Sequence, residues 1–242
     1  ANLFLDIKRN SMPNILLIES TSTICSVAIA DENSILSIRE TTDNSHSAVL
    51  TQYILDTLDD AGLKPHDLNA VAVSKGPGSY TGLRIGVSAA KGLCYALEIP
   101  LIAVDTLKSL AFKAKDVYPN HVICPMIDAR RMEVYTALFD VNANYLLNTE
   151  AKVVDEVFLN DMKKILDDNK VVFLGSGAEK SMSVIKHDNA VFDNKLNVSA
   201  ALLAPLSCKM YEEKIFEDLA YFEPFYLKEY IAKKSSVKAL NV

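Results

Sequence analysis

The sequence predicts an α/β fold of two lobes, the second of which is shorter than the first. Strand-like apolar runs alternate with helical patterns along the chain, which favours an α/β class over an all-β fold. The polar stretch 118–121 indicates a linker, and fewer helix–strand repeats follow it than precede it. We therefore expect an N-terminal lobe at 12–117 and a shortened C-terminal lobe at 118–242, with 1–11 as an upstream extension or cloning remnant.

The first lobe opens with three strand-like runs at 15–19, 26–30 and 35–39. Short polar turns separate the runs, and this spacing predicts antiparallel hairpins. A long helix is expected over 46–61, with Gly62 at its C-terminal stop. The apolar residues that recur there at helical spacing are Val49, Leu50, Tyr53, Ile54 and Leu58.

A strand, a helix, a strand and a helix complete the first lobe. Their predicted ranges are 70–74, 81–97, 101–104 and 106–117, with Thr106 as the N-cap of the last helix. Three strands followed by this alternation give the element order of half of an actin/hexokinase-type (ribonuclease H-like) domain pair. The second half has fewer elements. Strands are expected at 122–128, 133–140 and 171–175, helices at 157–167 and 199–214, and an extended aromatic stretch at 222–229.

The composition is that of an ordinary globular protein, with a net charge of −6 and a pI near 5.3. This acidic balance argues against a broad nucleic-acid footprint, which needs a basic face. If RNA is involved, a partner is expected to supply most of the phosphate contacts.

No apolar run reaches the length of a membrane span, and 1–11 does not resemble a signal peptide, so a cytoplasmic protein is expected. Four well-separated cysteines without a CxxC pair predict buried free thiols rather than disulfides or zinc ligands: Cys25, Cys94, Cys124 and Cys208.

The most informative segment is KGPGSYTGLRIGVSAAKGL at 75–93, which holds three glycines within the helix predicted there. Each helical glycine costs about 1 kcal/mol relative to alanine, so the helix needs a compensating reason for them. Gly82, Gly86 and Ala90 recur every four residues and line one face. That face either packs internally against the sheet or forms a helix–helix interface between subunits, together with helix 46–61.

The glycine turn at 76–79 could instead be a phosphate loop, because amides at a helix N-terminus bind anions. It lacks both the GxxxxGK[ST] pattern and the GxGxxG pattern, so this signal is weak.

The segment SKGPGSYTGLRIGVSAAKGL, with IESTS at 18–22 and AVDTL at 103–107, closely resembles the TsaB (YeaZ-like) family. This family is the small paralogue of the tRNA threonylcarbamoyl transferase TsaD. The resemblance is strong over 14–111 and weaker beyond, where CPMIDARRMEVYTALFD at 124–140 is the clearest match. It implies two actin-like lobes and pairing with a TsaD-type transferase through the N-terminal helices, with a TsaE-type ATPase in a larger assembly that modifies tRNA.

The catalytic paralogue holds a metal ion with two histidines about four residues apart on one helix. In this chain His46 is present, but Leu50 stands four residues later, and the other histidines are isolated. We expect no metal site and no catalytic residue.

Nucleotide binding is a second possibility that the resemblance raises. Actin-like ATPases place an acidic residue and a glycine turn between their first two strands. Here that turn has Glu19, Ser20 and Thr21 but no glycine. A second turn, with Gly175 and Gly177, falls where this fold class often contacts adenosine. ATP therefore stays possible as a ligand, although position in a fold does not establish a site.

A peptidase is a further alternative, because relatives of this family were described as glycoproteases. The charged turn from Asp128 to Glu133 is the candidate position, but the chain has neither a Gly-x-Ser-x-Gly elbow nor an HExxH motif. A solvated hairpin tip or a partner contact is the alternative interpretation of this turn.

The leading hypothesis is a non-catalytic scaffold that binds and activates a TsaD-type transferase. It forms a homodimer when alone and meets tRNA only through the complex. The rivals are a small actin-fold ATPase, a residual glycoprotease-like peptidase and a direct RNA-binding protein. The residues predicted at the partner interface are His46, Val49, Leu50, Tyr53, Gly82, Arg84, Gly86, Ala89 and Ala90.

Overall fold

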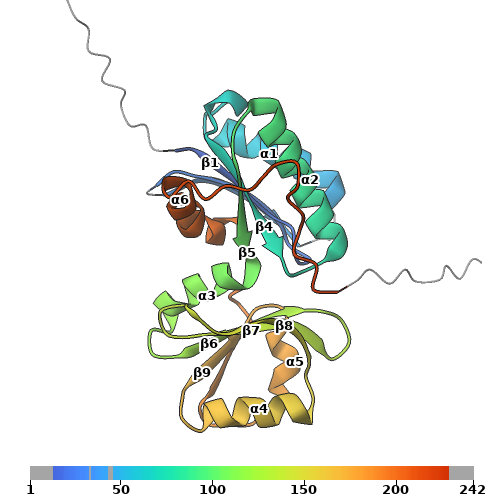
Figure 1. Ribbon diagram of the computed structural model, residues 1–242, viewed down its shortest axis with the longest axis vertical. Coiled ribbons are helices and arrows are strands. Elements are labelled where there is room, and N and C mark those ends of the chain that lie inside the picture. Colours follow the sequence, from blue (N-terminus) through green and yellow to red (C-terminus); the bar gives the residue numbers. More distant parts are fainter. Residues whose placement is uncertain (1–12, 33, 43–45, 229–242) are drawn as a thin grey trace, which may run out of the picture.

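Each half of the chain forms one five-stranded mixed sheet in a computed structural model that describes residues 13–32, 34–42 and 46–228 (Figure 1). The predicted extension 1–11 and the end of the tail lie outside these ranges. The first sheet has the order β3-β2-β1-β4-β5 and comprises β1 (Ile15–Glu19), β2 (Cys25–Ala30), β3 (Ile35–Thr41), β4 (Ala70–Gly76) and β5 (Leu101–Asp105). The second has the order β10-β9-β6-β7-β8 and comprises β6 (Val122–Asp128), β7 (Glu133–Phe139), β8 (Tyr145–Val153), β9 (Val171–Leu174) and β10 (Ala190–Asp193).

The two sheets repeat one topology. In the first, β1 pairs antiparallel with β2 and parallel with β4, which in turn pairs parallel with β5. In the second, β6 pairs antiparallel with β7 and parallel with β9, which pairs parallel with β10. Every residue of β1 and β2 is buried, because both faces of the first sheet are covered, and this explains why both strands are mainly apolar.

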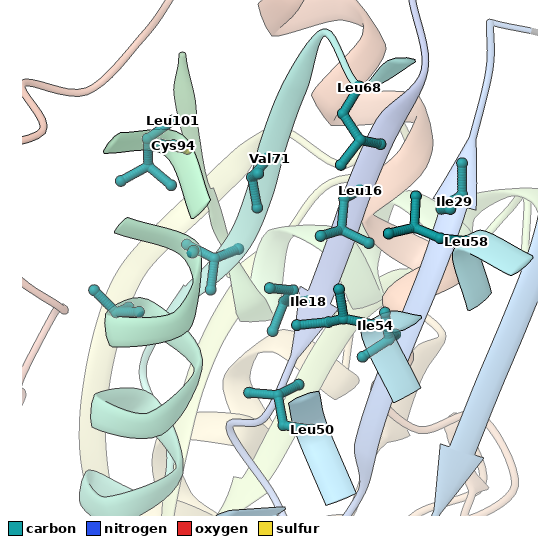
Figure 2. Packing of buried hydrophobic residues seen from close by; sticks show 14 of the residues in the cluster. Leu16, Ile18, Ile29, Leu50, Ile54, Leu58, Leu68, Val71, Cys94 and Leu101 are labelled. Atoms are coloured by element: carbon teal, nitrogen blue, oxygen red, sulfur yellow. The ribbon is translucent and has the colours of Figure 1, made fainter. Parts of the chain in front are cut away.

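Two long helices, α1 (His46–Asp60) and α2 (Tyr80–Leu97), cover one face of the first sheet. Figure 2 shows Leu50 and Ile54 of α1 packed over Ile18 of β1, with Cys94 of α2 in the same cluster. The short 3₁₀ turn η1 (Pro65–Asp67) leads into β4. The amphipathic spacing read from the sequence therefore predicts both helices within one residue at each end.

The opposite face of the first sheet is covered by residues from far along the chain. The 3₁₀ turn η2 (Ala200–Leu203) and helix α6 (Ala204–Glu212) bury their apolar side chains against β1, β2, β4 and β5. Ser199, predicted to begin one helix, caps η2. The stretch 118–242, predicted as one lobe, therefore divides between the two sheets, because the first sheet needs a cover that its own sequence segment does not supply.

Helix α3 (Thr106–Val117) lies between the sheets (Figure 1) and packs its apolar face mainly on the second sheet, against Phe139 and Val172. Its N-cap is Asp105, which accepts a hydrogen bond from the Lys108 amide at 2.9 Å; Thr106, the predicted cap, is the first helical residue. Helices α4 (Glu156–Leu166) and α5 (Ala178–Met182) cover the other face of that sheet.

The second lobe is shortened in its helices and not in its sheet. Helix α5 has 5 residues where α2 has 18, yet all five strands are present. Strands β8 and β10 were not predicted. Most residues of the edge strand β8 are exposed, and β10 has only 4 residues, so neither shows a buried apolar run.

After α6 the chain returns along the first lobe as an extended segment, residues 217–228, which we term the strap. The Glu217 amide donates to the Leu101 carbonyl at 2.9 Å, and the Phe225 amide donates to the Lys75 carbonyl at 2.7 Å. Figure 1 shows the strap, in red, running along α2 toward the second lobe. Lys228 at its end forms an ion pair with Glu133 at the start of β7. The strap, predicted only as an extended aromatic stretch, thus connects the two lobes.

All four cysteines are free and buried, as predicted. Burial raises the pKa of the Cys25 and Cys94 thiols to about 11 and that of Cys124 to about 12. These thiols are therefore protonated at neutral pH and unsuited to act as nucleophiles. None of the helices in the described ranges combines the length and apolar character that a membrane-spanning helix requires.

Candidate functional site

The turn after β1 packs tightly against the loop and first turns of α2. The Ser20 hydroxyl donates to the Gly82 carbonyl at 2.9 Å, and the Ser79 amide donates to the Thr21 carbonyl at 2.6 Å. A Cβ atom at Gly82 would lie 1.9 Å from the Ser20 carbonyl oxygen, and one at Gly78 would lie 2.3 Å from that of Thr21. Only glycine permits so close an approach. Gly78 and Gly82 therefore allow the turn after β1 to pack against α2 and its preceding loop within the first lobe.

The same packing corrects the interface prediction for the small-residue face. A Cβ atom at Gly86 would lie 2.2 Å from the Ser20 hydroxyl oxygen. Gly82, Gly86 and Ala90 are all buried, and Leu50 of α1 belongs to the core beneath the helices. Of the two alternatives for this face, the structure therefore supports internal packing, because the turn after β1 already fills the space that another subunit would need.

The other predicted interface residues are more accessible. Ala89 of α2 is half-buried and packs against the core. Arg84 is exposed, with its guanidinium 4.6 Å from the centre of the Tyr80 ring. Val49 and Tyr53 are half-buried and pack against the core cluster beneath α1. The side chain of His46 lies outside the described residues.

The exposed residues over these two helices form a surface that we term the α1–α2 face. Leu55 is 49% exposed and Tyr95 is 81% exposed, which are high fractions for large apolar side chains. The exposed residues that define the face are Ala48, Leu55, Arg84, Ser88 and Tyr95.

The turn with Glu19, Ser20 and Thr21, predicted as a possible phosphate contact, is closed by its own hydrogen bonds. Glu19 Oε1 accepts from the amide and the hydroxyl of Thr21, each at 2.6 Å, and Oε2 accepts from the Ser74 hydroxyl. All three turn residues are buried. Burial raises the pKa of Glu19, although its hydrogen bonds oppose that shift. The Ser20 and Thr21 hydroxyls already donate to protein acceptors, so the turn is built as a packing element.

The second predicted turn, Gly175 to Gly177, packs in the other lobe against β6. The Gly177 amide donates to the Met126 carbonyl at 2.9 Å, and Gly175 has a φ of 92°. A Cβ atom at Gly175 would lie 2.6 Å from that carbonyl oxygen. Close packing between strands and turn therefore accounts for these two glycines without a ligand.

A cavity of about 860 Å³ lies between the lobes, beside the carboxyl ends of β4 and β5 and beneath the strap. Lys75, Asp105 and Tyr145 line it, together with strap residues. Burial raises the pKa of Asp105, while the Lys108 amide and the charge of Lys75 oppose the shift. Ligands of open α/β sheets bind outside the carboxyl ends of strands, so this cavity is where a small molecule would fit. The sequence did not indicate it, because Tyr145 belongs to the unpredicted strand β8.

The charged turn between β6 and β7 has its carboxylates paired with lysines. Asp128 pairs with Lys180 of α5 at 2.6 Å, and Glu133 pairs with Lys228 of the strap. Within the described ranges, no group of three or more histidine, cysteine or carboxylate side chains is placed to hold a metal ion. Leu50, which stands four residues after His46 at the position where the resemblance leads us to expect the paralogue's second metal-binding histidine, is 2% exposed.

The duplicated sheets define a class, a two-lobed protein of actin/hexokinase type, and in this chain the turn after the first strand is buried and packed against α2. Comparison with known proteins specifies the family. Residues 33–240 match the family profile described as TsaD, tRNA N6-adenosine threonylcarbamoyltransferase. The chain is 30% identical over 225 residues to the Escherichia coli tRNA threonylcarbamoyladenosine biosynthesis protein TsaB, covering 91% of this chain and 96% of that protein.

A second relative supports the same family, and a solved structure supports the fold. The TsaB protein of Bacillus subtilis is 36% identical over 165 residues, covering 66% of this chain and 70% of that protein. A Pseudomonas aeruginosa crystal structure, described as similar to peptidase YeaZ, superposes with a TM-score of 0.77 at 24% identity, over 90% of this chain and 100% of that one. The chain belongs to the TsaB (YeaZ-like) family.

Proposed function

We propose that this protein acts in tRNA threonylcarbamoyladenosine biosynthesis as a non-catalytic partner that binds and activates a TsaD-type transferase. The observation that carries the proposal is the closed turn after β1. Where an ATPase of this fold would receive phosphates, Glu19, Ser20 and Thr21 are buried and hydrogen-bonded within the protein. The names of the relatives supply the process in which the protein takes part.

The α1–α2 face is the proposed contact with the transferase. It exposes Leu55 and Tyr95 on two rigid helices whose inner faces are anchored in the core. Exposed apolar side chains of this kind are enriched at protein interfaces. The same face joins two copies of the chain when the transferase is absent. In a two-fold symmetric dimer, each copy contributes the same surface patch to the interface. A TsaE-type ATPase joins the larger assembly, and tRNA is bound mainly by the partners.

The test measures binding and activity separately. The chain is titrated calorimetrically into a TsaD-type transferase, and tRNA modification is assayed with and without the chain. Tight binding together with stimulated modification supports the proposal. If the chain neither binds the transferase nor changes the rate of modification, the proposal is wrong.

A second candidate function, ATP binding with hydrolysis, is favoured by the cavity between the lobes that Lys75 and Asp105 line. Titration of the chain alone with ATP and magnesium distinguishes the two. The scaffold proposal predicts no micromolar binding and no turnover, and detection of both would favour the enzyme.

A further inference from the structure

The tip of the β6–β7 hairpin holds two adjacent arginines in an unusual backbone conformation. Arg130 has a φ of 71° and Arg131 a φ of 50°, in the left-handed region that residues other than glycine and asparagine seldom adopt. The turn is closed by hydrogen bonds from the Ala129 amide to the Glu133 carbonyl and from the Glu133 amide to the Arg130 carbonyl. Both arginine residues are exposed. The fold thus exposes two consecutive arginines at the tip of a hydrogen-bonded hairpin.

The charges around the tip do not cancel. Its two carboxylates are matched by lysines, Asp128 by Lys180 and Glu133 by Lys228. Neither Arg130 nor Arg131 forms an ion pair with another residue in the described ranges, so the tip carries an excess of two positive charges. The whole chain has a net charge of −6, and the tip is therefore a local exception to the acidic balance.

The tip is connected to the α1–α2 face by a run of cationic and aromatic side chains. Lys228 forms an ion pair with Glu133 and stands two residues after Tyr226 in the strap. The centre of the Tyr226 ring lies 4.9 Å from that of the Tyr80 ring. Tyr80 in turn lies beneath the guanidinium of Arg84, which belongs to the α1–α2 face. These contacts connect the tip, through the strap, to Arg84 of the α1–α2 face, where the transferase is proposed to bind.

We infer that the β6–β7 hairpin tip binds backbone phosphates of the tRNA through Arg130 and Arg131. The guanidinium group is suited to this role, because its planar donors match phosphate oxygens in a bidentate arrangement. Contacts of this kind carry no sequence information and position the RNA. This inference rests on the proposed function, and it goes further by giving the chain a direct contact with the tRNA.

The test compares tRNA binding by the chain–transferase complex over a range of salt concentrations. The variant R130N/R131G removes both charges and introduces residues that adopt the left-handed region readily, so the turn should keep its shape. Each lost phosphate contact makes the plot of log affinity against log salt shallower by about one unit, so the slope should fall by about two. Affinity at low salt should fall several-fold.

Two controls accompany the test. The variant K163A/K164A on α4 removes the same charge from exposed positions elsewhere in the second lobe and should leave the slope unchanged. R130K/R131K keeps the charge and should retain the slope. Thermal unfolding checks each variant, and R130Q/R131Q replaces R130N/R131G if the latter does not fold.

The results that would overturn this inference differ from the results that would overturn the proposed function. An unchanged slope for R130N/R131G, or an equal change for K163A/K164A, overturns the inference even if the chain still activates the transferase. Weaker binding to the transferase in the absence of RNA would assign the tip to a protein contact and overturns it as well. Failure of the wild-type chain to bind or activate the transferase concerns the proposed function itself.

Discussion

Replacing Gly86 by alanine tests whether the small-residue face of α2 packs internally. The added Cβ would lie 2.2 Å from the Ser20 hydroxyl oxygen, which must rotate away and lose its hydrogen bond to the Gly82 carbonyl. A buried hydroxyl without a partner costs about 1–3 kcal/mol, and overpacking adds about 1–3 kcal/mol. Alanine returns about 1 kcal/mol of helix propensity. Together these contributions predict a net loss in unfolding free energy of about 1–5 kcal/mol, with a midpoint of about 3 kcal/mol.

Urea unfolding of a double-mutant cycle measures this directly. In S20A/G86A the nearest contacts of the new Cβ would be the residue 20 Cβ at 3.4 Å and Ile18 Cγ2 at 3.5 Å, which the core tolerates. The double variant should therefore recover to within about 1 kcal/mol of S20A. Ser20→Ala should not rescue Gly82→Ala, whose clash is with a backbone oxygen. No described atom lies within 4 Å of a Cβ at Gly92, so Gly92→Ala should stabilise by about 1 kcal/mol. A neutral Gly86→Ala with no coupling to Ser20 would refute the reasoning.

Three further predictions follow from burial and from the strap. Because burial raises the pKa of Glu19, this carboxyl group binds a proton more readily in the folded protein than in the unfolded chain. The free energy of unfolding should therefore rise as pH falls through the folded-state pKa of Glu19. Thermal unfolding measured over a range of pH should show a smaller rise for Glu19→Gln. The buried thiols, with Cys124 as the extreme case, should react with a thiol reagent at neutral pH only as fast as the protein opens, whereas rapid labelling of the native protein would contradict their burial. Tyr226→Ala removes the ring contact with Tyr80, so limited proteolysis should cut the strap faster, with little change in the midpoint of global unfolding.

Much of the first lobe can be predicted from sequence because each element shows its own periodicity. Residues 15–18 form an unbroken apolar run, since α1 and η2 cover both faces of β1. Helix α1 ends where Gly62 adopts a positive φ, as the stop signal predicts. These features depend on short-range chemistry that the local sequence records.

The elements that were missed depend on contacts between distant segments. Strand β8 pairs with β7 only on one edge, and its side chains are mostly exposed, so its sequence shows no alternation. Helix α6 covers the first sheet although it follows the whole second sheet along the chain. No local pattern encodes which sheet a late helix covers.

The candidate site divides in the same way. The helical spacing of its glycines predicts a close neighbour, but whether that neighbour is Ser20 or another subunit depends on tertiary structure. The sequence predicts Arg130 and Arg131 as part of a charged turn. Their positive φ values and the pairing of the nearby carboxylates with lysines depend on contacts between distant segments, which only the structure shows.

The central claim is that the α1–α2 face binds and activates a TsaD-type transferase. The most direct measurement compares Leu55→Glu on α1 with Val157→Glu on α4, since both replace an exposed apolar side chain, 49% and 67% exposed, by a carboxylate. A charge buried without a partner at an interface weakens binding, so Leu55→Glu should lower affinity for the transferase about tenfold or more and reduce tRNA modification in parallel. Val157→Glu should behave as the wild type. Full binding and activation by Leu55→Glu would contradict the account.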